Sequence, residues 1–152
     1  MILDSYSTDA TESIARSSGA RFYQRKLDSF IKQMQAAVDL ASHNWVFCID
    51  QDERATEELR QTVISLKRQG FPKDGYTVKR LNFYMTDWFT RCGWYPDRKI
   101  RLFNRQKAHW GGHEPHSELL MDKGTAIGHL PCCLQHYSYC NLSHQIVKMD
   151  LF

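Results

Sequence analysis

A run of five apolar residues followed at once by acidic residues constrains this chain more than any other feature. Residues 45–49 read Trp-Val-Phe-Cys-Ile, and residues 50–53 read Asp-Gln-Asp-Glu. Because the apolar run does not alternate with polar residues, it predicts a strand buried on both faces, as in the middle of a parallel sheet. Ligands of open α/β sheets bind beyond the carboxyl ends of such strands. The sequence therefore predicts a cluster of carboxylates at a ligand site.

The acidic residues have two interpretations. Asp50 and Asp52 form a D-x-D pattern, and close carboxylates repel one another unless they share a cation. This favours a site for Mg²⁺ or Mn²⁺ that in turn holds a diphosphate. The other interpretation is a solvated strand end that leads into a helix N-terminus, where acidic side chains are favourable. The spacing alone leaves both open.

Composition excludes several classes of protein. The chain has 152 residues, of which 42% are hydrophobic, and a net charge of +3. It is long enough to bury a core as one soluble domain, and it lacks the strongly basic character of a nucleic-acid binder. No apolar stretch approaches the ~20 residues of a membrane span, and no signal peptide opens the chain. Cys48 lies inside the predicted core strand, which suits a reduced thiol and predicts a cytoplasmic protein.

The expected elements alternate between strands and helices through the first half of the chain. Asp9, Asp28 and Thr56 are placed to begin helices, and Gly19 and Gly70 to end two of them. Together with strands at 21–24 and 45–49, this order predicts a doubly wound α/β sheet. The second half brings strands at 76–84 and 99–103, a polar loop around 113–118 and a helix from 142. We expect one domain, with sub-regions 1–74 and 75–152.

A different site is possible near the C-terminus. Cysteine and histidine alternate there in a C-x₂-H-x₃-C-x₃-H pattern formed by Cys133, His136, Cys140 and His144. Thiolates and imidazoles suit a structural zinc ion. Residues 137–139 read as strand, however, so His136 and Cys140 would share a face while Cys133 points away. A zinc-binding module is therefore an alternative with a geometric objection.

Five ordered segments resemble a known family. They are residues 4–9 (Asp-Ser-Tyr-Ser-Thr-Asp), residues 45–53, Gly93 to Asp97 with 101–103, Trp110-Gly111-Gly112 with Pro115-His116, and residues 136–139 (His-Tyr-Ser-Tyr). In this set the chain resembles family 2 glycosyltransferases of the GT-A fold, above all the lipopolysaccharide-core β-glucosyltransferase type. The resemblance covers nearly the whole chain. Relative to that family the chain lacks the first strand-loop unit and the C-terminal end, so we expect a partial transferase domain.

The resemblance implies a donor site. Asp4 is similar to the family's nucleobase contact, Asp50 to its ribose contact and Asp52 to its metal ligand. The implied donor is a nucleotide-diphosphate sugar such as UDP-glucose, with Mg²⁺ or Mn²⁺ as cofactor. A bound divalent ion stabilises the charge that builds on a departing diphosphate.

The resemblance also implies an acceptor site. Trp94, Tyr95, Asp97 and Arg101 are expected to bind a lipid-linked, lipopolysaccharide-core-type saccharide, in a groove facing the D-x-D site. This implies peripheral contact with the inner face of the membrane, to which the basic residues around Arg101 would contribute. The other interpretation is that the aromatic residues only fill the core beneath a loop, and that the basic residues are solvated strand edges.

An inverting transfer needs a general base, and here the chain departs from the family. Relatives carry an acid directly after the histidine that matches His116, but this chain has Ser117. Glu118 and Glu114 are the candidates to replace that acid, and His116 is expected beside them at the catalytic site. A second departure is Met34-Gln35, where relatives carry Lys/Arg-Asn. These departures support an alternative in which the chain is a catalytically impaired remnant that binds nucleotide or a partner chain.

Overall fold

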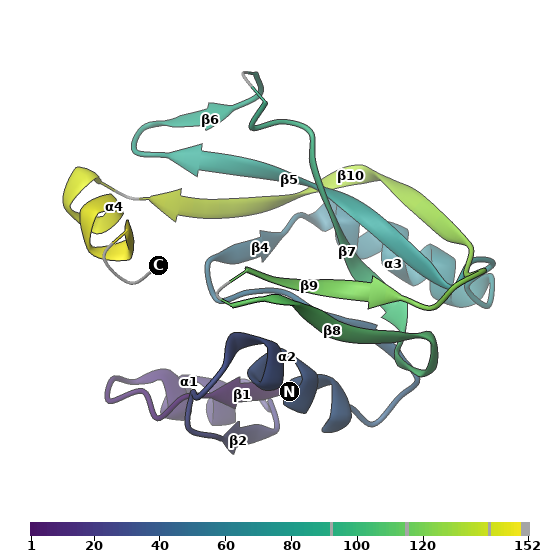
Figure 1. Cartoon of the computed structure of the whole chain (residues 1–152), viewed down its shortest axis with the longest axis horizontal. Helices are drawn as coiled ribbons and strands as arrows, with labels where there is room; N and C mark the ends of the chain where they lie inside the picture. The colour runs from purple at the N-terminus through teal and green to yellow at the C-terminus, as the bar shows by residue number, and fades with distance from the viewer. Residues whose placement is uncertain (92, 115, 140, 150–152) are drawn as a thin grey trace. The chain divides into compact units, whose positions relative to one another are not determined.

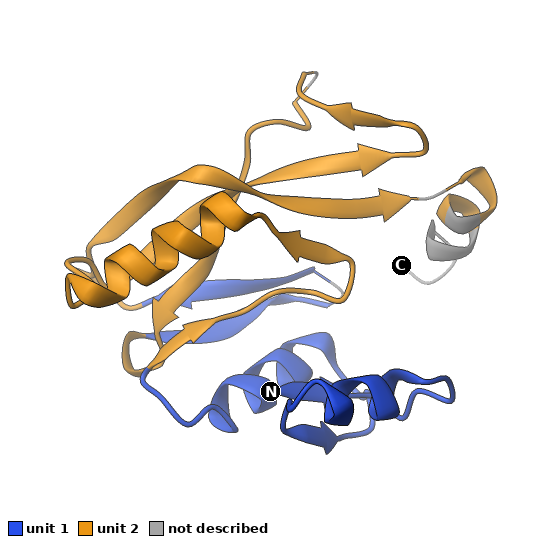
Figure 2. Ribbon diagram, turned by 180° about the vertical axis from the view of Figure 1, so that it is seen from behind, with its two compact units in different colours: residues 1–44, 108–121 blue, residues 45–107, 122–152 orange. Residues whose placement is uncertain are grey.

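The computed structural model describes residues 1–91, 93–114, 116–139 and 141–149. They form two compact units, which Figure 2 colours separately. Unit 1 contains residues 1–44 and 108–121, and unit 2 contains residues 45–107 and 122–152. The predicted sub-regions, 1–74 and 75–152, therefore each contribute to both units.

Unit 1 begins with a parallel strand-helix-strand arrangement. β1 (Ile2–Asp4) pairs in parallel with β2 (Phe22–Gln24), and α1 (Thr11–Ser17) connects them. The helix begins two residues later than Asp9, whose carboxylate accepts hydrogen bonds from the backbone N–H and the hydroxyl of Thr11. The predicted helix and strand are thus confirmed, with a small shift at the helix start.

The rest of unit 1 is a helix on a hairpin. α2 (Phe30–Asp39) contacts both β8 (Ala108–His113) and β9 (His116–Met121), which pair antiparallel. Oε1 of Gln35 accepts a hydrogen bond of 2.9 Å from the backbone N–H of Trp110, so the helix is tied to the hairpin. In the polar segment that was expected to be a loop, His113 is instead the last residue of β8, and residues 116–118 belong to β9.

A six-stranded sheet forms the frame of unit 2 (Figure 1). Its strands follow the order β3, β7, β5, β10, β4, and β6 pairs with β5. The β5/β10 pair is parallel and the other pairs are antiparallel. The bounds are β3 (Trp45–Phe47), β4 (Glu53–Ala55), β5 (Gly75–Tyr84), β6 (Asp87–Phe89), β7 (Asp97–Asn104) and β10 (Ile127–Tyr139).

One helix packs on this sheet and closes the core of unit 2. α3 (Glu57–Arg68) contacts β10 and runs alongside the strands of the sheet in Figure 2. The hydroxyl of Thr56 accepts a hydrogen bond of 3.2 Å from the N–H of Leu59, so the predicted cap is confirmed. The helix places Leu59 in a buried cluster with the central strands. The other members of that cluster are Tyr76, Val78, Leu102, Leu130, Cys132 and Leu134.

The apolar run at 45–49 does not form the predicted central parallel strand. β3 covers only Trp45–Phe47, lies at one end of the strand order and pairs antiparallel with β7. Trp45 stacks on Phe71 with ring centroids 4.0 Å apart, and Phe47 packs against the same core. The apolar side chains are half-buried from an edge position, and Ile49 is 45% exposed. An unbroken apolar run does not by itself distinguish a central strand from an edge strand.

The predicted doubly wound parallel sheet is replaced by a mixed arrangement. Parallel pairing is found for β1/β2 in unit 1 and for β5/β10 in unit 2, and the other described pairs are antiparallel. The regular alternation of strand and helix ends after α2, where β3 and β4 follow one another, and hairpin connections follow after α3. Hairpins give antiparallel neighbours, whereas parallel neighbours need longer crossovers. The fold class is therefore mixed α/β.

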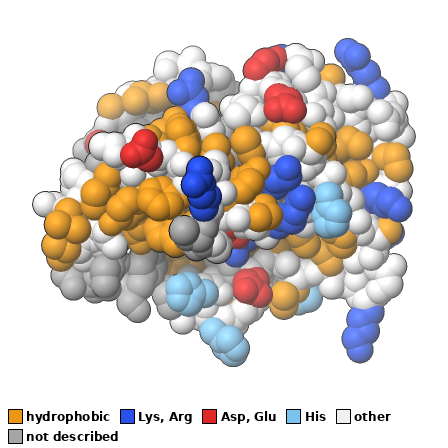
Figure 3. All heavy atoms as spheres, turned by 90° about the horizontal axis from the view of Figure 1, so that it is seen from above, with side chains coloured by type: hydrophobic (Ala, Val, Ile, Leu, Met, Phe, Trp, Pro, Cys, Tyr) orange, Lys and Arg blue, Asp and Glu red, His pale blue; other side chains and the backbone are white. Residues whose placement is uncertain are grey.

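Aromatic side chains gather at the end of the sheet formed by β5, β6 and β10. Phe89, Trp94 and Tyr139 each meet Tyr84 edge-on, with ring centroids 5.7, 5.7 and 5.8 Å apart. Figure 3 views the molecule from above, where these strands lie nearest, and shows hydrophobic side chains gathered at the surface with a few charged ones between them. These aromatics pack on one another but are only half-buried or exposed.

The last described element is α4 (Leu142–Met149), which begins at the predicted residue. The hydroxyl of Tyr84 donates a hydrogen bond of 2.6 Å to Oε1 of Gln145. The helix was expected to continue to Phe152, but residues 150–152 lie outside the described part of the chain. In that part, no helix combines the length and the apolar character needed to cross a membrane. A short 3₁₀ helix, η1 (Arg105–Lys107), precedes β8.

Candidate functional site

The predicted carboxylates lie in a tight turn between β3 and β4. We call residues 50–53 the acidic turn. The backbone N–H of Glu53 donates to the carbonyl oxygen of Asp50, and Oε2 of Glu53 accepts from the N–H of Asp50, both at 3.0 Å. The side chains of Asp50 and Asp52 are 37% and 27% exposed, whereas that of Glu53 is 0% exposed. The two aspartates are thus open to a ligand, and Glu53 holds the turn.

Two arginines surround the buried glutamate. Nη2 of Arg101 lies 2.7 Å from Oδ2 of Asp50 and 2.5 Å from Oε1 of Glu53. Nη1 of Arg80 lies 3.8 Å from the same Oε1, and its Nη2 lies 2.6 Å from Oδ2 of Asp97. Positive and negative groups therefore alternate from Asp97 to Asp50. This pairing is what allows a carboxylate to be buried at Glu53.

Burial and neighbouring charges shift the pKa values of the groups in this network. Burial raises the pKa of the Glu53 carboxyl, and the nearby Arg101 only partly opposes this. For Arg101, burial alone would lower the pKa, but the charges of Asp50 and Glu53 outweigh it and the pKa is raised. Two carboxylates share one guanidinium, so Arg101 stays charged. Burial also raises the pKa of the adjacent Cys48 thiol to about 11, which keeps it protonated near neutral pH.

His136 meets the acidic turn from β10. Its backbone lies opposite Glu53 in the β10/β4 pairing, and its Nε2 lies 3.5 Å from Oδ2 of Asp52. Its other ring nitrogen, Nδ1, lies 2.6 Å from Oδ1 of Asn82 and 3.0 Å from Oγ of Ser138. The imidazole is held at one nitrogen and presents the other to Asp52.

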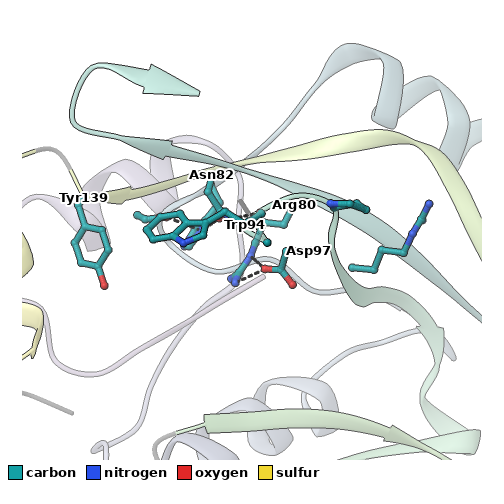
Figure 4. Close-up of a pocket in the computed structure, with 10 residues that line it drawn as sticks. Arg80, Asn82, Trp94, Asp97 and Tyr139 are labelled. Carbon is teal, nitrogen blue, oxygen red and sulfur yellow. Dashed lines mark hydrogen bonds and ion pairs between the residues drawn. The ribbon is translucent and has the colours of Figure 1, made fainter. Parts of the chain in front are cut away.

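The same histidine lines a pocket of about 470 Å³ in unit 2. Figure 4 shows the side chains of Arg80 and Asp97 pointing toward one another in its wall, with Trp94 beside them. Since His136 both lines this pocket and contacts Asp52, the pocket adjoins the acidic turn. The lining residues are Arg80, Asn82, Gly93, Trp94, Pro96, Asp97, Arg98, His136, Ser138 and Tyr139.

The four residues expected at the acceptor site are placed differently. Trp94 and Asp97 line the pocket, whereas Tyr95 is half-buried and is not among the lining residues. Arg101 is only 5% exposed and its Nη2 is bound by the acidic turn. The structure therefore brings Trp94 and Asp97 to a cavity beside Asp52. Whether an acceptor binds there remains a prediction.

Asp4, the expected nucleobase contact, lies in unit 1 at the end of β1. Its carboxylate accepts hydrogen bonds from the backbone N–H of Ser7 at 2.9 Å and from the hydroxyl of Ser7 at 2.5 Å. Nε2 of Gln24 adds a third at 3.3 Å. These bonds, above all that of the Ser7 hydroxyl, lower the pKa of Asp4. The lowered pKa keeps the carboxylate charged although the residue is only 7% exposed, and the hydrogen bonds tie it into its own loop.

The expected general bases lie on the β8/β9 hairpin of unit 1 and have different surroundings. The carboxylate of Glu114 accepts hydrogen bonds from the Ser29 hydroxyl and from the backbone N–H groups of Phe30 and Ile31. It therefore caps the N-terminus of α2, and the bond from Ser29 contributes most to its lowered pKa. His116 and Glu118 are two positions apart on β9, and both are exposed.

The zinc interpretation gains no support from the described residues. Cys140 lies outside them, and of His144 only the backbone is described. Within the described part of the chain, no group of three or more His, Cys, Asp or Glu side chains is placed to hold a metal ion. His136 faces Asp52 instead, and Cys133 lies an odd number of positions from it on β10, which places it on the other face.

Sequence reasoning missed Arg80 and His136 as partners of the acidic turn, and Asn82 as the residue that holds His136. Arg80 and Asn82 were part of a predicted strand, and His136 was considered only for zinc and as part of the resemblance. Their shared signal is polar residues on strands that lie in the middle of the sheet, because buried polar side chains need partners. A search for polar residues on β5 and β10 would have identified Arg80, Asn82 and His136 as candidates.

Comparison with known proteins points to one class of enzyme. No protein-family model matches the chain. The whole chain is 27% identical to the lipopolysaccharide core biosynthesis glycosyltransferase LpsC of Rhizobium meliloti and covers 58% of it. It is 28% identical to an uncharacterized glycosyltransferase of Rickettsia typhi and 23% identical to one of Rickettsia bellii, covering 55% of each. These relatives are glycosyltransferases.

The chain spans slightly more than half the length of the curated relatives that it matches. Its mixed α/β structure is compatible with part of a glycosyltransferase fold. The relatives' names imply a sugar donor and an acceptor in general terms. They name neither the donor nor the metal.

Proposed function

We propose that this chain carries the donor and acceptor sites of a glycosyltransferase that moves glucose from UDP-glucose to a lipid-linked, lipopolysaccharide-core-type saccharide with inversion. The observation that carries the proposal is the contact between Asp52 and His136 at the wall of the pocket that Trp94 and Asp97 line. The names of the relatives supply the reaction class. We also propose that the chain belongs to family 2 of the glycosyltransferases and has part of the GT-A fold.

The side chains that could act as metal ligands in this site suit Mg²⁺ or Mn²⁺. Mg²⁺ is commonly held by one or two carboxylates, with phosphates and water completing its shell, and a neutral imidazole is a common metal ligand through Nε2 or Nδ1. Asp52 and His136 would hold the ion, and the partial exposure of Asp52 leaves room for a diphosphate. When bound, the ion offsets the negative charge that develops on the departing diphosphate.

The remaining donor contacts follow from the placement of the other acids. Asp50 keeps a 37% exposed side chain while Arg101 fixes its orientation, so we assign it to a ribose hydroxyl. Asp4 is assigned to the nucleobase, because a charged carboxylate held by Ser7 and Gln24 can accept a further N–H donor.

The acceptor side uses the pocket. The exposed Trp94 ring offers a flat apolar surface to a sugar, and Asp97 is held by Arg80, so its orientation is fixed. We assign the general base to Glu118, since Glu114 is engaged at the end of α2. In the transfer, the acceptor oxygen bonds to the anomeric carbon as the bond to the diphosphate breaks. The hydroxyl proton passes to the Glu118 carboxylate.

The proposed acceptor places the protein at the cytoplasmic face of the inner membrane. Arg98 and Lys99 are exposed on β7, and Arg98 lines the pocket. Cations at this position suit the phosphates of a lipid-linked acceptor or of the membrane surface.

A remnant without activity is the second candidate. It is favoured by Ser117 at the position of the family's acid and by the engagement of Glu114 as a helix cap. Such a chain would still bind the nucleotide through Asp50 and Asp52, but it would not transfer the sugar.

The test combines binding with turnover. Titration of the purified chain with UDP-glucose and Mn²⁺ should show Mn²⁺-dependent binding that Asp52→Ala abolishes, with unchanged far-UV circular dichroism. Asp122→Ala, in a turn outside the acidic turn and the pocket lining, is the matched control and should bind normally. Undiminished binding by Asp52→Ala would contradict the donor site. Binding without sugar transfer to a lipopolysaccharide-core acceptor would favour the remnant.

A further inference from the structure

Asn82 lies where three parts of the site meet. It is on β5, is 6% exposed and lines the pocket. Its Nδ2 donates a hydrogen bond of 3.0 Å to the carbonyl oxygen of Trp94, and its Oδ1 lies 2.6 Å from Nδ1 of His136. The side-chain amide therefore joins the Trp94 segment to β10.

These contacts fix the orientation of the amide. The carbonyl oxygen of Trp94 can only accept a hydrogen bond, so the NH₂ group of Asn82 must face it. The amide oxygen then faces His136. A flipped amide would set two carbonyl oxygens against each other at Trp94.

The amide orientation in turn fixes the histidine. An amide oxygen can only accept, so Nδ1 of His136 must carry the proton in their 2.6 Å contact. The hydroxyl of Ser138, 3.0 Å from the same nitrogen, is compatible because a hydroxyl can also accept. With Nδ1 protonated, a neutral imidazole has its lone pair at Nε2. That nitrogen lies 3.5 Å from Oδ2 of Asp52.

We infer that Asn82 is a positioning residue that selects the Nδ1–H tautomer of His136, so that a lone pair and a carboxylate converge beside the pocket. The opposite tautomer would place an N–H at Nε2, which would donate to Asp52 and leave no lone pair for a cation. Hydrogen-bond partners of a ligand histidine commonly set its tautomer and basicity in this way. The use of that lone pair rests on the proposed function, whereas the tautomer itself does not.

Nitrogen NMR of the whole chain tests the tautomer directly. Two-bond ¹H–¹⁵N correlation of ¹⁵N-histidine-labelled protein, at a pH about two units above the ordinary histidine pKa of about 6.5, distinguishes protonated from bare ring nitrogens. The His136 signals are assigned by their loss in His136→Ala. We expect Nδ1 protonated and Nε2 bare in the wild type. A bare Nδ1 in the wild type would overturn the inference without the need for any other variant.

Two variants at position 82 separate the effect of the hydrogen-bond acceptor of the amide, its oxygen, from that of the hydrogen-bond donor, its NH₂ group. Asn82→Asp keeps an oxygen facing His136 and loses the donor to Trp94, so Nδ1 should stay protonated. Asn82→Leu removes both groups, and Nε2 should become protonated in a substantial fraction of molecules. An unchanged tautomer in a folded Asn82→Leu would overturn the inference.

Mn²⁺ binding in the presence of UDP gives the second measurement. Loss of a residue that orients a ligand histidine typically weakens metal affinity about 10–100-fold. We expect this loss for Asn82→Leu and a smaller one for Asn82→Asp. If the wild type shows the Nδ1–H tautomer but binds neither Mn²⁺ nor UDP, the proposed function fails and the positioning role stands. Equal Mn²⁺ affinity of wild type and Asn82→Leu would contradict the positioning role.

Discussion

Nε2 of His136 lies 3.5 Å from Oδ2 of Asp52, and strand register places it there. His136 is the partner of Glu53 in the antiparallel pairing of β10 with β4, and the N–H of Tyr137 donates to the carbonyl oxygen of Asp52 at 2.8 Å. A shift of one residue in this register would turn His136 to the other face of the sheet. The geometry of the candidate site is therefore a property of the sheet and not of the acidic turn alone.

The buried ion pair between Glu53 and Arg101 predicts a large effect on stability. Their side chains are 0% and 6% exposed, and removal of one partner leaves the other charge buried and unpaired. We expect Glu53→Ala and Arg101→Met each to lower the free energy of unfolding by about 3–5 kcal/mol. Urea unfolding followed by circular dichroism near neutral pH measures this.

A matched control is available on the same unit. Glu57 pairs with Arg60 on the surface of α3, and both side chains are largely exposed. Glu57→Ala should change stability little, because exposed ion pairs contribute little. If Arg101→Met instead left stability unchanged and raised the KM for the acceptor, Arg101 would be the acceptor contact that the sequence suggests.

Sequence reasoning succeeded where structure depends on local signals. The hydroxyl of Thr56 caps α3 as predicted, and Gly70 follows that helix with φ +73°. Both features are decided within a few residues, by a side chain that satisfies free N–H groups and by a residue that tolerates positive φ. The D-x-D acids follow a strand as the sequence indicates, and their role at a metal site stays a prediction.

The predictions that were wrong concern features that depend on pairing between segments distant in the sequence. Nothing near Trp45 indicates that its strand lies at a sheet edge, because that position depends on which distant strands pair with it, and among the described strands it pairs with β7. The acidic turn has partners on three other strands, Arg80 on β5, Arg101 on β7 and His136 on β10. The hairpin at 108–121 was missed because His113 and its neighbours are polar, although Glu114 is fixed there by α2.

The pocket predicts a split between donor and acceptor binding. Trp94 is 40% exposed and lines the pocket, whereas Trp88 packs against Phe83 and Tyr137 and is not among the lining residues. We expect Trp94→Phe to raise the KM for the acceptor about 2–10-fold, from the loss of roughly 0.5–1.5 kcal/mol of ring contact. Binding of UDP-glucose should not change.

Trp88→Phe is the control, with an unaltered KM for the acceptor. Steady-state transfer assays at saturating UDP-glucose give these values, and titration with UDP-glucose alone gives the donor affinity. Equal effects of the two variants on KM would show that the aromatic residues act only through packing.

Replacement by Gln should have different consequences at Glu114 and at Glu118, on stability at the first and on sugar transfer at the second. Glu114 caps α2 and its pKa is lowered, chiefly by the Ser29 hydroxyl. A carboxyl with a lowered folded-state pKa contributes stability above its ordinary pKa of about 4.3, and this contribution is lost as the pH falls through the folded-state value. Glu114→Gln should therefore unfold at lower urea concentration than the wild type near neutral pH, with a gap that closes as the pH falls below about 4.

Glu118 is exposed on β9, and we assign it the proton of the acceptor hydroxyl. Glu118→Gln should leave the urea midpoint unchanged and lower the rate of sugar transfer about 10²–10⁴-fold, the usual contribution of a general base. Glu114→Gln should keep most of the transfer rate once corrected for the unfolded fraction. The reverse result, a stable and inactive Glu114→Gln variant together with an active Glu118→Gln variant, would assign the general base to Glu114. The Glu114 carboxylate would then have to leave the N-terminus of α2 during the reaction. If both variants lost stability and neither changed the rate, the base would lie elsewhere, with His116 as the next candidate because it shares the exposed face of β9 with Glu118.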